Sequence, residues 1–258
     1  MNNIKIVFFD IDGTLFKLHT NEMSPKTLET LQKLHANGIK ICIATGRSPM
    51  GLPKFEGIEF DAYLTYNGSY CYADEETIFS NPLPKDDVKQ ILHNAAKMGK
   101  PVTVALKSEM ASNGVDDDLK SYMAVENLDL NVSDDFYKKA EDKVYQVMLA
   151  CCPEEYAGIL ENVEHAKIAT WWDKAIDIIP ANGGKGMGIE AMLAYYGFDK
   201  SEALAFGDGN NDIEMLQTVG TGVAMGNASE DLKVVADEVC GDVAEDGIYY
   251  YCISHGLI

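Results

Sequence analysis

The chain has 258 residues, of which 47% are hydrophobic and 24% charged, a composition typical of a globular protein long enough for two folding units. Its formal charge is −20, from 21 Lys and Arg against 41 Asp and Glu. It has no basic run, so neither nucleic acid nor an anionic membrane surface is an expected partner. An anionic substrate would need a locally positive site, built from a metal ion and a few Lys or Arg.

The six cysteines form no CxxC pair, and their spacing predicts neither a zinc site nor a disulfide framework. Free thiols in a reducing compartment are the expected state. The first apolar run, residues 4–9, is too short for a signal peptide, and no stretch approaches the length of a membrane span. We therefore expect a cytoplasmic protein.

Two segments of the chain show the pattern of a parallel α/β fold. Residues 4–9 are nearly continuously apolar, as in a strand buried on both faces. Ser24 and Pro25 predict the start of a helix with a buried Leu stripe that Gly38 ends. Further strands are expected at 39–44 and 63–66. After Lys185 the pattern resumes, with helices expected at 188–196 and from 212, and strands at 203–206 and 222–225.

Between Pro82 and Pro180 the pattern changes. A helix is expected at 86–98 and strands at 102–106, 144–150 and 168–172, and about a hundred residues suffice for a small domain. The predicted fold is α/β, with a doubly wound, mostly parallel Rossmann-like core from residues 1–81 and 182–258. An inserted α/β domain occupies residues 82–181.

The first chemical motif is Asp10-Ile11-Asp12-Gly13-Thr14, directly after the first strand. Loops at the carboxyl ends of parallel strands are where such folds bind ligands. Asp10 is a candidate nucleophile, because carboxylates form acyl-phosphate intermediates. Asp12 can protonate a leaving oxygen and later deprotonate water. By itself the motif also fits a solvated acidic turn.

Two further motifs supply groups that can hold phosphate. Thr45 and Gly46, after the second strand, offer a hydroxyl and backbone N–H groups, and Arg47 adds a charge-assisted donor. Lys185, in a glycine-rich turn that opens a helix, brings positive charge and a helix N-terminus. Each motif taken alone also fits an ordinary turn.

The fourth motif is Gly207-Asp208-Gly209-Asn210-Asn211-Asp212, after the strand at 203–206. Asp208 can complete an oxygen-ligand set for Mg²⁺, Asn211 can reach phosphate, and Asp212 can orient Lys185 or a metal-bound water. An EF-hand is excluded because its sixth loop position would be Ile213 instead of Gly.

In this order, each motif being placed after a strand or opening a helix, the four resemble the haloacid dehalogenase (HAD) superfamily, and within it the Cof-like sugar-phosphatase group with a type IIB cap. The resemblance covers about residues 1–80 and 182–258, and the segment at 242–247 resembles that group's closing segment. It implies a Mg²⁺-dependent phosphatase of small phosphorylated metabolites, with sugar phosphates as the expected class.

The resemblance also implies a role for each matched residue. Asp10 would be the nucleophile, Asp12 the general acid and base, and Lys185 a catalytic cation. Asp10, Asp208 and the backbone carbonyl of Asp12 would ligate Mg²⁺, with Asp212 behind them. Phosphate or substrate binding falls to Ile11, Thr45, Gly46, Arg47, Lys185 and Asn211. The inserted domain would be the cap that selects the substrate.

Some alternatives remain open from the sequence. A phosphomutase on the same scaffold would return the phosphoryl group to a second hydroxyl of the substrate. A non-catalytic sensor would only bind a phosphorylated ligand. Asn67-Gly68 can line the pocket or form a turn, Trp171 and Trp172 are expected in the core, and Asp173-Lys174 in a solvated turn. The preferred metabolite and the oligomeric state are not encoded in these motifs.

Overall fold

The computed structural model describes residues 3–17, 20, 22–125, 128–172 and 174–258. The chain divides into two compact units. Unit 1 comprises residues 1–46, 53–79 and 185–258, and unit 2 comprises residues 47–52 and 80–184.

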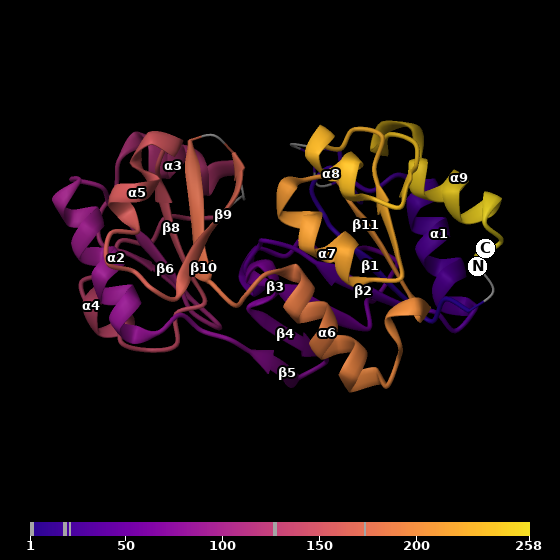
Figure 1. Cartoon of the computed structure of the whole chain (residues 1–258), viewed down its shortest axis with the longest axis horizontal. Helices are drawn as coiled ribbons and strands as arrows, with labels where there is room; N and C mark the ends of the chain where they lie inside the picture. Colours follow the sequence, from indigo (N-terminus) through magenta and orange to yellow (C-terminus); the bar gives the residue numbers. More distant parts are fainter. Residues whose placement is uncertain (1–2, 18–19, 21, 126–127, 173) are drawn as a thin grey trace. The chain divides into compact units, whose positions relative to one another are not determined.

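Unit 1 is built on an eight-stranded sheet of order β13-β12-β11-β1-β2-β3-β4-β5 (Figure 1). The pairs from β13 to β3 are parallel, and β4 joins β3 antiparallel. The strands are β1 (Ile6–Phe9), β2 (Lys40–Ala44), β3 (Ala62–Thr65), β4 (Tyr70–Ala73), β5 (Glu76–Ser80), β11 (Ala203–Gly207), β12 (Thr221–Ala224) and β13 (Glu238–Val239).

Helices cover both faces of this sheet, as the apolar strands require. The helices are α1 (Pro25–Ala36), α6 (Lys185–Tyr196), α7 (Ile213–Thr218), α8 (Glu230–Val235) and α9 (Gly247–Ser254). Figure 1 shows α1 and α9 on one side of the sheet, and α6 and α7 on the other. All four residues of β1 are fully buried, because this central strand is covered on both faces. The predicted doubly wound α/β core is therefore confirmed.

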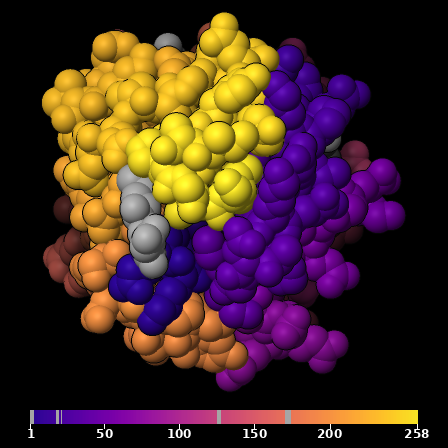
Figure 2. Space-filling model, turned by 90° about the vertical axis from the view of Figure 1, so that its right-hand side faces the viewer, coloured from indigo at the N-terminus to yellow at the C-terminus, as the bar shows by residue number. Residues whose placement is uncertain are grey.

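The N-terminal and C-terminal parts of the described chain pack together in unit 1. Figure 2 shows the C-terminal segment (yellow) packed against the N-terminal part of the chain (indigo). Helix α1 begins as predicted, since the hydroxyl of Ser24 accepts from the N–H of Thr27 at 3.0 Å and Pro25 occupies the first turn. The side chain of Asn37 donates to the carbonyl of Leu257 at 2.9 Å. The segment after α9 thus contacts the residue that ends α1, and α9 itself packs against α1.

Unit 2 contains a five-stranded antiparallel sheet of order β7-β6-β8-β10-β9. Its strands are β6 (Thr103–Ala105), β7 (Met110–Ser112), β8 (Gln146–Ala150), β9 (Ala166–Trp172) and β10 (Ala175–Pro180), and its helices are α2 (Lys85–Lys97), α3 (Asp117–Val125), α4 (Phe136–Lys139) and α5 (Tyr156–Ile159).

The two faces of the unit 2 sheet are packed differently. Ile176 and Ile178 of β10 belong to a hydrophobic core shared with α2, α4 and α5. Asp177 lies between them and, because strand side chains alternate, points to the opposite face, where the hydroxyl of Tyr122 on α3 donates to it. The side chains of Trp171 and Trp172, and Asp173 as a whole, lie outside the described part of the chain.

Most predicted elements differ from the observed ones by one to three residues at their ends, which is usual for boundaries. One difference matters for function. The strand expected at 63–66 ends at Thr65, because Tyr66 and Asn67 have left-handed backbones, with φ of 51° and 52°. The sequence also did not reveal β4 and β5, which extend the sheet beyond β3. All six cysteines are free, as expected.

Candidate active site

Strand register brings three of the predicted motifs to one edge of the unit 1 sheet. Phe9, the last residue of β1, is level with Ile43 of β2 and Phe206 of β11. All three strands are parallel, so the residues that follow them emerge at the same edge. The N–H of Asp10 donates to the carbonyl of Phe206 at 3.1 Å. Asp10, Thr45 and Asp208 therefore begin three neighbouring loops.

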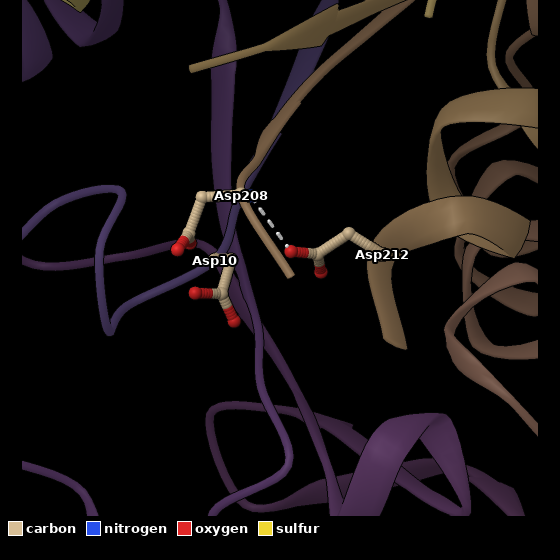
Figure 3. A group of neighbouring side chains, drawn as sticks. All are labelled: Asp10, Asp208 and Asp212. Atoms are coloured by element: carbon tan, nitrogen blue, oxygen red, sulfur yellow. Dashed lines mark hydrogen bonds between the residues drawn. The ribbon is translucent and has the colours of Figure 1, made fainter. Parts of the chain in front are cut away.

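Three carboxylates converge at this edge. Asp10, Asp208 and Asp212 each offer an oxygen that lies within 4.8 Å of the others (Figure 3). Asp10 and Asp212 are buried, and Asp208 is half-buried. Figure 3 shows the side chains of Asp10 and Asp208 coming from adjacent strand ends, with Asp212 reaching toward them from the segment that leads into α7. Three acidic groups in so small a volume require a compensating positive charge.

Lys185 supplies part of that charge. It is the first residue of α6 and is fully buried. Its Nζ donates to Oδ1 of Asp10 at 2.6 Å and to Oδ1 of Asp212 at 2.5 Å. A buried ammonium is tolerated only when it is paired in this way. The third motif thus joins the first and fourth through one cation.

Asp212 has a second contact that fixes the Asp208 loop. Its Oδ2 accepts from the backbone N–H groups of Asp208 at 2.9 Å and of Gly209 at 3.0 Å. One oxygen of Asp212 therefore holds Lys185 and the other holds the loop. This arrangement makes Asp212 a support for the cluster, and it leaves Asp10 and Asp208 as the carboxylates better placed to ligate a cation.

The protonation of the cluster reflects its burial. Desolvation raises the pKa of Asp10, and the charges of Asp212 and Asp12 raise it further, whereas Lys185 lowers it. Desolvation followed by the charges of Asp10 and Asp212 raises the pKa of Asp208. Burial alone would lower the pKa of Lys185, but the charges of Asp10 and Asp212 outweigh it and raise that pKa. The lysine stays charged, and Asp10 and Asp208 hold a proton more readily than exposed carboxyl groups do.

The first motif shapes the space beside Asp208. Gly13 has a φ of +91°, and a Cβ on it would lie 2.1 Å from Oδ2 of Asp208, so only glycine fits here. The hydroxyl of Thr14 donates to Oδ1 of Asp208 at 2.9 Å. The side chain of Ile11 is buried, and its carbonyl accepts from the N–H of Leu15 at 3.0 Å. Asp12 is half-buried.

The second motif lies beside the fourth. Thr45 is buried, and its N–H donates to the carbonyl of Leu64 at 2.9 Å. A Cβ on Gly46 would lie 3.2 Å from both terminal atoms of the Asn67 side chain. The amide of Asn211 donates to Oδ1 of Asn67 at 3.2 Å. Thr45, Gly46 and Asn211 are thus linked through Asn67.

Arg47 is the one proposed site residue that packs with unit 2. Its side chain is buried, and its guanidinium donates to the carbonyl of Gly51 at 3.1 Å. The role of Arg47 in substrate binding stays a prediction. Lys174 is exposed.

The cluster fits a hard divalent cation. Its donors are carboxylate oxygens, which Mg²⁺ prefers. Asp10 and Asp208 lie side by side, and among the described residues Lys185 is the only buried ammonium. Desolvation, followed by repulsion from neighbouring carboxylates, raises the pKa values of Asp10 and Asp208, so their ionised forms are disfavoured without a cation. A bound Mg²⁺ would stabilise the ionised carboxylates.

Two residues that support the site, Thr14 and Asn227, were not predicted from the sequence to belong to it. Thr14 is part of the first motif, but its hydrogen bond to Asp208 forms only because the loops after β1 and β11 come together. The side chain of Asn227 donates to the carbonyl of Gly13 at 2.8 Å, and its Oδ1 accepts from the N–H of Val243. Asn227 sits in no recognisable motif, so only its contacts reveal it.

Comparison with known proteins gives consistent matches along the whole chain. A family model described as haloacid dehalogenase-like hydrolase matches residues 7–252. YkrA of Bacillus subtilis (strain 168) is 34% identical, with 98% of each chain covered. The 5-amino-6-(5-phospho-D-ribitylamino)uracil phosphatase YitU of the same organism is 28% identical over 94% of each chain. The structure of the HAD subclass IIB sugar phosphatase BT4131 is similar, with a TM-score of 0.89, 31% identity, and coverage of 98% of this chain and 100% of that one.

Proposed function

The chain belongs to the haloacid dehalogenase-like hydrolases and is a phosphoric monoester hydrolase, and on that premise we propose that it dephosphorylates small metabolites, sugar phosphates above all, with Mg²⁺ as cofactor. The observation that carries the proposal is the buried Asp10 carboxylate, held at 2.6 Å by Lys185 inside the carboxylate cluster. YitU and BT4131 bear the names of phosphatases that act on a phosphoribityl compound and on sugar phosphates.

In the proposed reaction, an oxygen of Asp10 attacks phosphorus while the bond from phosphorus to the substrate oxygen breaks. Asp12 gives its proton to the departing alcohol oxygen. Asp12, now a carboxylate, takes a proton from water, and the resulting hydroxide attacks the phosphorus of the aspartyl phosphate. Orthophosphate leaves and Asp10 is restored, so one ester and one water become one alcohol and one phosphate.

Asp10, Asp208 and the backbone carbonyl of Asp12 would hold Mg²⁺. When bound, the ion would offset the repulsion between the carboxylates and the phosphate oxygens. Lys185 adds positive charge at the same place, because its Nζ already touches the proposed nucleophile. Asp212 keeps that Nζ in position through its 2.5 Å contact. The cation and the nucleophile are thus arranged before substrate arrives.

The remaining predicted residues are proposed to bind the phosphate oxygens. Thr45 and Gly46 would donate through a hydroxyl and backbone N–H groups, and Asn211 through its amide. The backbone of Ile11 and the guanidinium of Arg47 complete the proposed set. Such donors stabilise the charge that spreads over the oxygens during transfer.

Unit 2 is proposed to act as the cap that selects the leaving group. Asp10, Asp208 and Lys185 all belong to unit 1, and Arg47 is the one residue of the proposed phosphate-binding set that belongs to unit 2. Unit 2 is then free to differ among relatives that act on different esters. Substituting exposed residues such as Lys174 should lower sugar-phosphate turnover more than that of p-nitrophenyl phosphate, whose small leaving group asks little of a cap.

No described helix is long and apolar enough to cross a membrane. We propose a cytoplasmic location, where phosphorylated metabolites are found and where the six free thiols stay reduced.

The experiment that tests the proposal is a phosphate-release screen against a panel of phosphorylated metabolites, with Mg²⁺ and with EDTA. We expect Mg²⁺-dependent release from several sugar phosphates. The Asp10→Asn variant should stay folded and lose steady-state turnover, since an amide is a poor nucleophile. Isomerised sugar phosphate without free phosphate would instead identify a phosphomutase. Release that EDTA leaves unchanged would contradict the role of the metal.

A further inference from the structure

The backbone beside the candidate active site is held in an unusual conformation. Tyr66, Asn67 and Gly68 follow β3 with φ values of 51°, 52° and 83°. Glycine and Asn visit this left-handed region readily, but a bulky residue such as Tyr does so rarely. A non-glycine residue in this region is strained and persists only when its surroundings enforce it. Tyr66 and Asn67 are both buried, so this turn is enforced by packing.

The strained turn places Asn67 between two phosphate-binding motifs. Its backbone N–H donates to the carbonyl of Thr45 at 3.0 Å. Its side-chain amide lies against Gly46, where a Cβ would be 3.2 Å from both Nδ2 and Oδ1. Its Oδ1 accepts from Nδ2 of Asn211 at 3.2 Å. With only 2% of its surface exposed, Asn67 ties the second motif to the fourth.

We propose that Asn67 is a positioning residue that sets the orientation of the Asn211 amide for phosphate binding, an inference that rests on the proposed function. An Asn amide can turn over so that its oxygen and nitrogen exchange places. In the turned orientation, the carbonyl oxygen of Asn211 would face Oδ1 of Asn67, and two acceptors cannot form a hydrogen bond. While Oδ1 of Asn67 faces Asn211, it favours the orientation in which Nδ2 of Asn211 faces it.

That orientation matters because the amide nitrogen carries two protons. One is used by Asn67, which fixes the plane of the Asn211 amide, and the second remains available to a phosphate oxygen. The left-handed turn is what brings Oδ1 of Asn67 to this point. The strain at Tyr66 and Asn67 thus gains a functional explanation: it places the acceptor that orients a phosphate-binding donor.

The test uses Asn67→Gly, because glycine adopts the left-handed backbone freely and removes only the amide. The matched control is Asn162→Gly, the same change at an exposed residue of unit 2 with a φ of 57°. Binding of inorganic phosphate in the presence of Mg²⁺ is measured by calorimetry for both variants, for Asn211→Ala and for the double variant Asn67→Gly/Asn211→Ala. Thermal melting confirms that each protein is folded.

We expect Asn67→Gly to weaken phosphate binding about 10-fold, which corresponds to about 1.4 kcal/mol, and Asn162→Gly to leave it within about 2-fold. In the Asn211→Ala background, Asn67→Gly should add less than about 2-fold, since a residue that acts through another shows no separate effect. Unchanged phosphate binding in folded Asn67→Gly would overturn the inference, as would effects of the two substitutions that multiply. If the wild type hydrolysed no ester, the proposed function would be contradicted but the inference about Asn67 would not, because phosphate binding is measured without turnover.

Discussion

Replacing Lys185 by Met tests whether this residue holds the carboxylate cluster together. In the native protein, Nζ of Lys185 lies 2.6 Å from Asp10 and 2.5 Å from Asp212. Met has a similar length and no charge, so the change leaves both carboxylates buried without their cation. Removing one partner of a buried ion pair costs about 3–5 kcal/mol. We expect that loss in the free energy of unfolding at pH 8.5, measured by urea denaturation in EDTA with far-UV circular dichroism.

The loss should shrink as the pH falls. Desolvation already raises the pKa of Asp10 above its ordinary value, and Lys185 is the group that holds it down. Without Lys185, that pKa rises further. A carboxyl group with a raised folded-state pKa destabilises the fold above that pKa, and protonation relieves the cost as the pH falls toward the unfolded value near 4. At pH 5.5 we expect the loss of stability relative to wild type to be smaller than at pH 8.5 by at least about 1.4 kcal/mol, the free energy that corresponds to one pKa unit.

Lys200→Met provides the control, since the salt bridge from Lys200 to Glu190 at 2.7 Å is about half exposed on both sides. Exposed pairs contribute about 0–1 kcal/mol, so this variant should lose little at either pH. The reasoning would be refuted if Lys185→Met lost no more stability than Lys200→Met, or if its loss did not depend on pH.

Three further predictions concern the metal ligands and the glycine beside them. Asp208→Ala should raise the Mg²⁺ concentration needed for half-maximal phosphate release by about 10-fold or more, because a ligating carboxylate is lost; an unchanged titration would remove Asp208 from the site. Gly13→Ala should lower the rate of phosphate release by about 10-fold or more, since its Cβ would lie 2.1 Å from Oδ2 of Asp208; full activity would contradict the steric argument. Mg²⁺ binding should release up to about one proton at pH 7 and fewer at pH 9, because the pKa values of Asp10 and Asp208 are raised; calorimetric heats that do not depend on the buffer would contradict this.

The alternating helix and strand signals of unit 1 follow from local physics, which is why they can be read from the sequence. A strand such as residues 6–9 must be apolar throughout because helices cover both its faces. A helix such as α1 needs Ser24 and Pro25 at its start because its first N–H groups lack partners. The order of the motifs was equally visible, since each follows a strand end or opens a helix. The confirmed fold class rests on these local rules.

The antiparallel extension by β4 and β5 was not visible in the same way. Short strands of four or five residues carry little periodic signal. The end of β3 was misplaced because Tyr66 has high strand propensity, while the packing around it imposes a left-handed backbone. Tertiary contacts override a local preference whenever burial contributes more free energy than the preference costs.

Apart from the expected pairing of Asp212 with Lys185, the contacts inside the site were decided by the tertiary structure. The sequence determined that Asp10, Lys185 and Asp212 are present and that each lies at the end of a strand or the start of a helix. The ammonium of Lys185 contacts both Asp10 and Asp212 because of the strand register and because the first residue of α6 is buried. The link from Asn67 to Asn211 spans 144 residues. No local pattern specifies such a contact, because a hydrogen bond between distant segments is set by the packing of the whole unit.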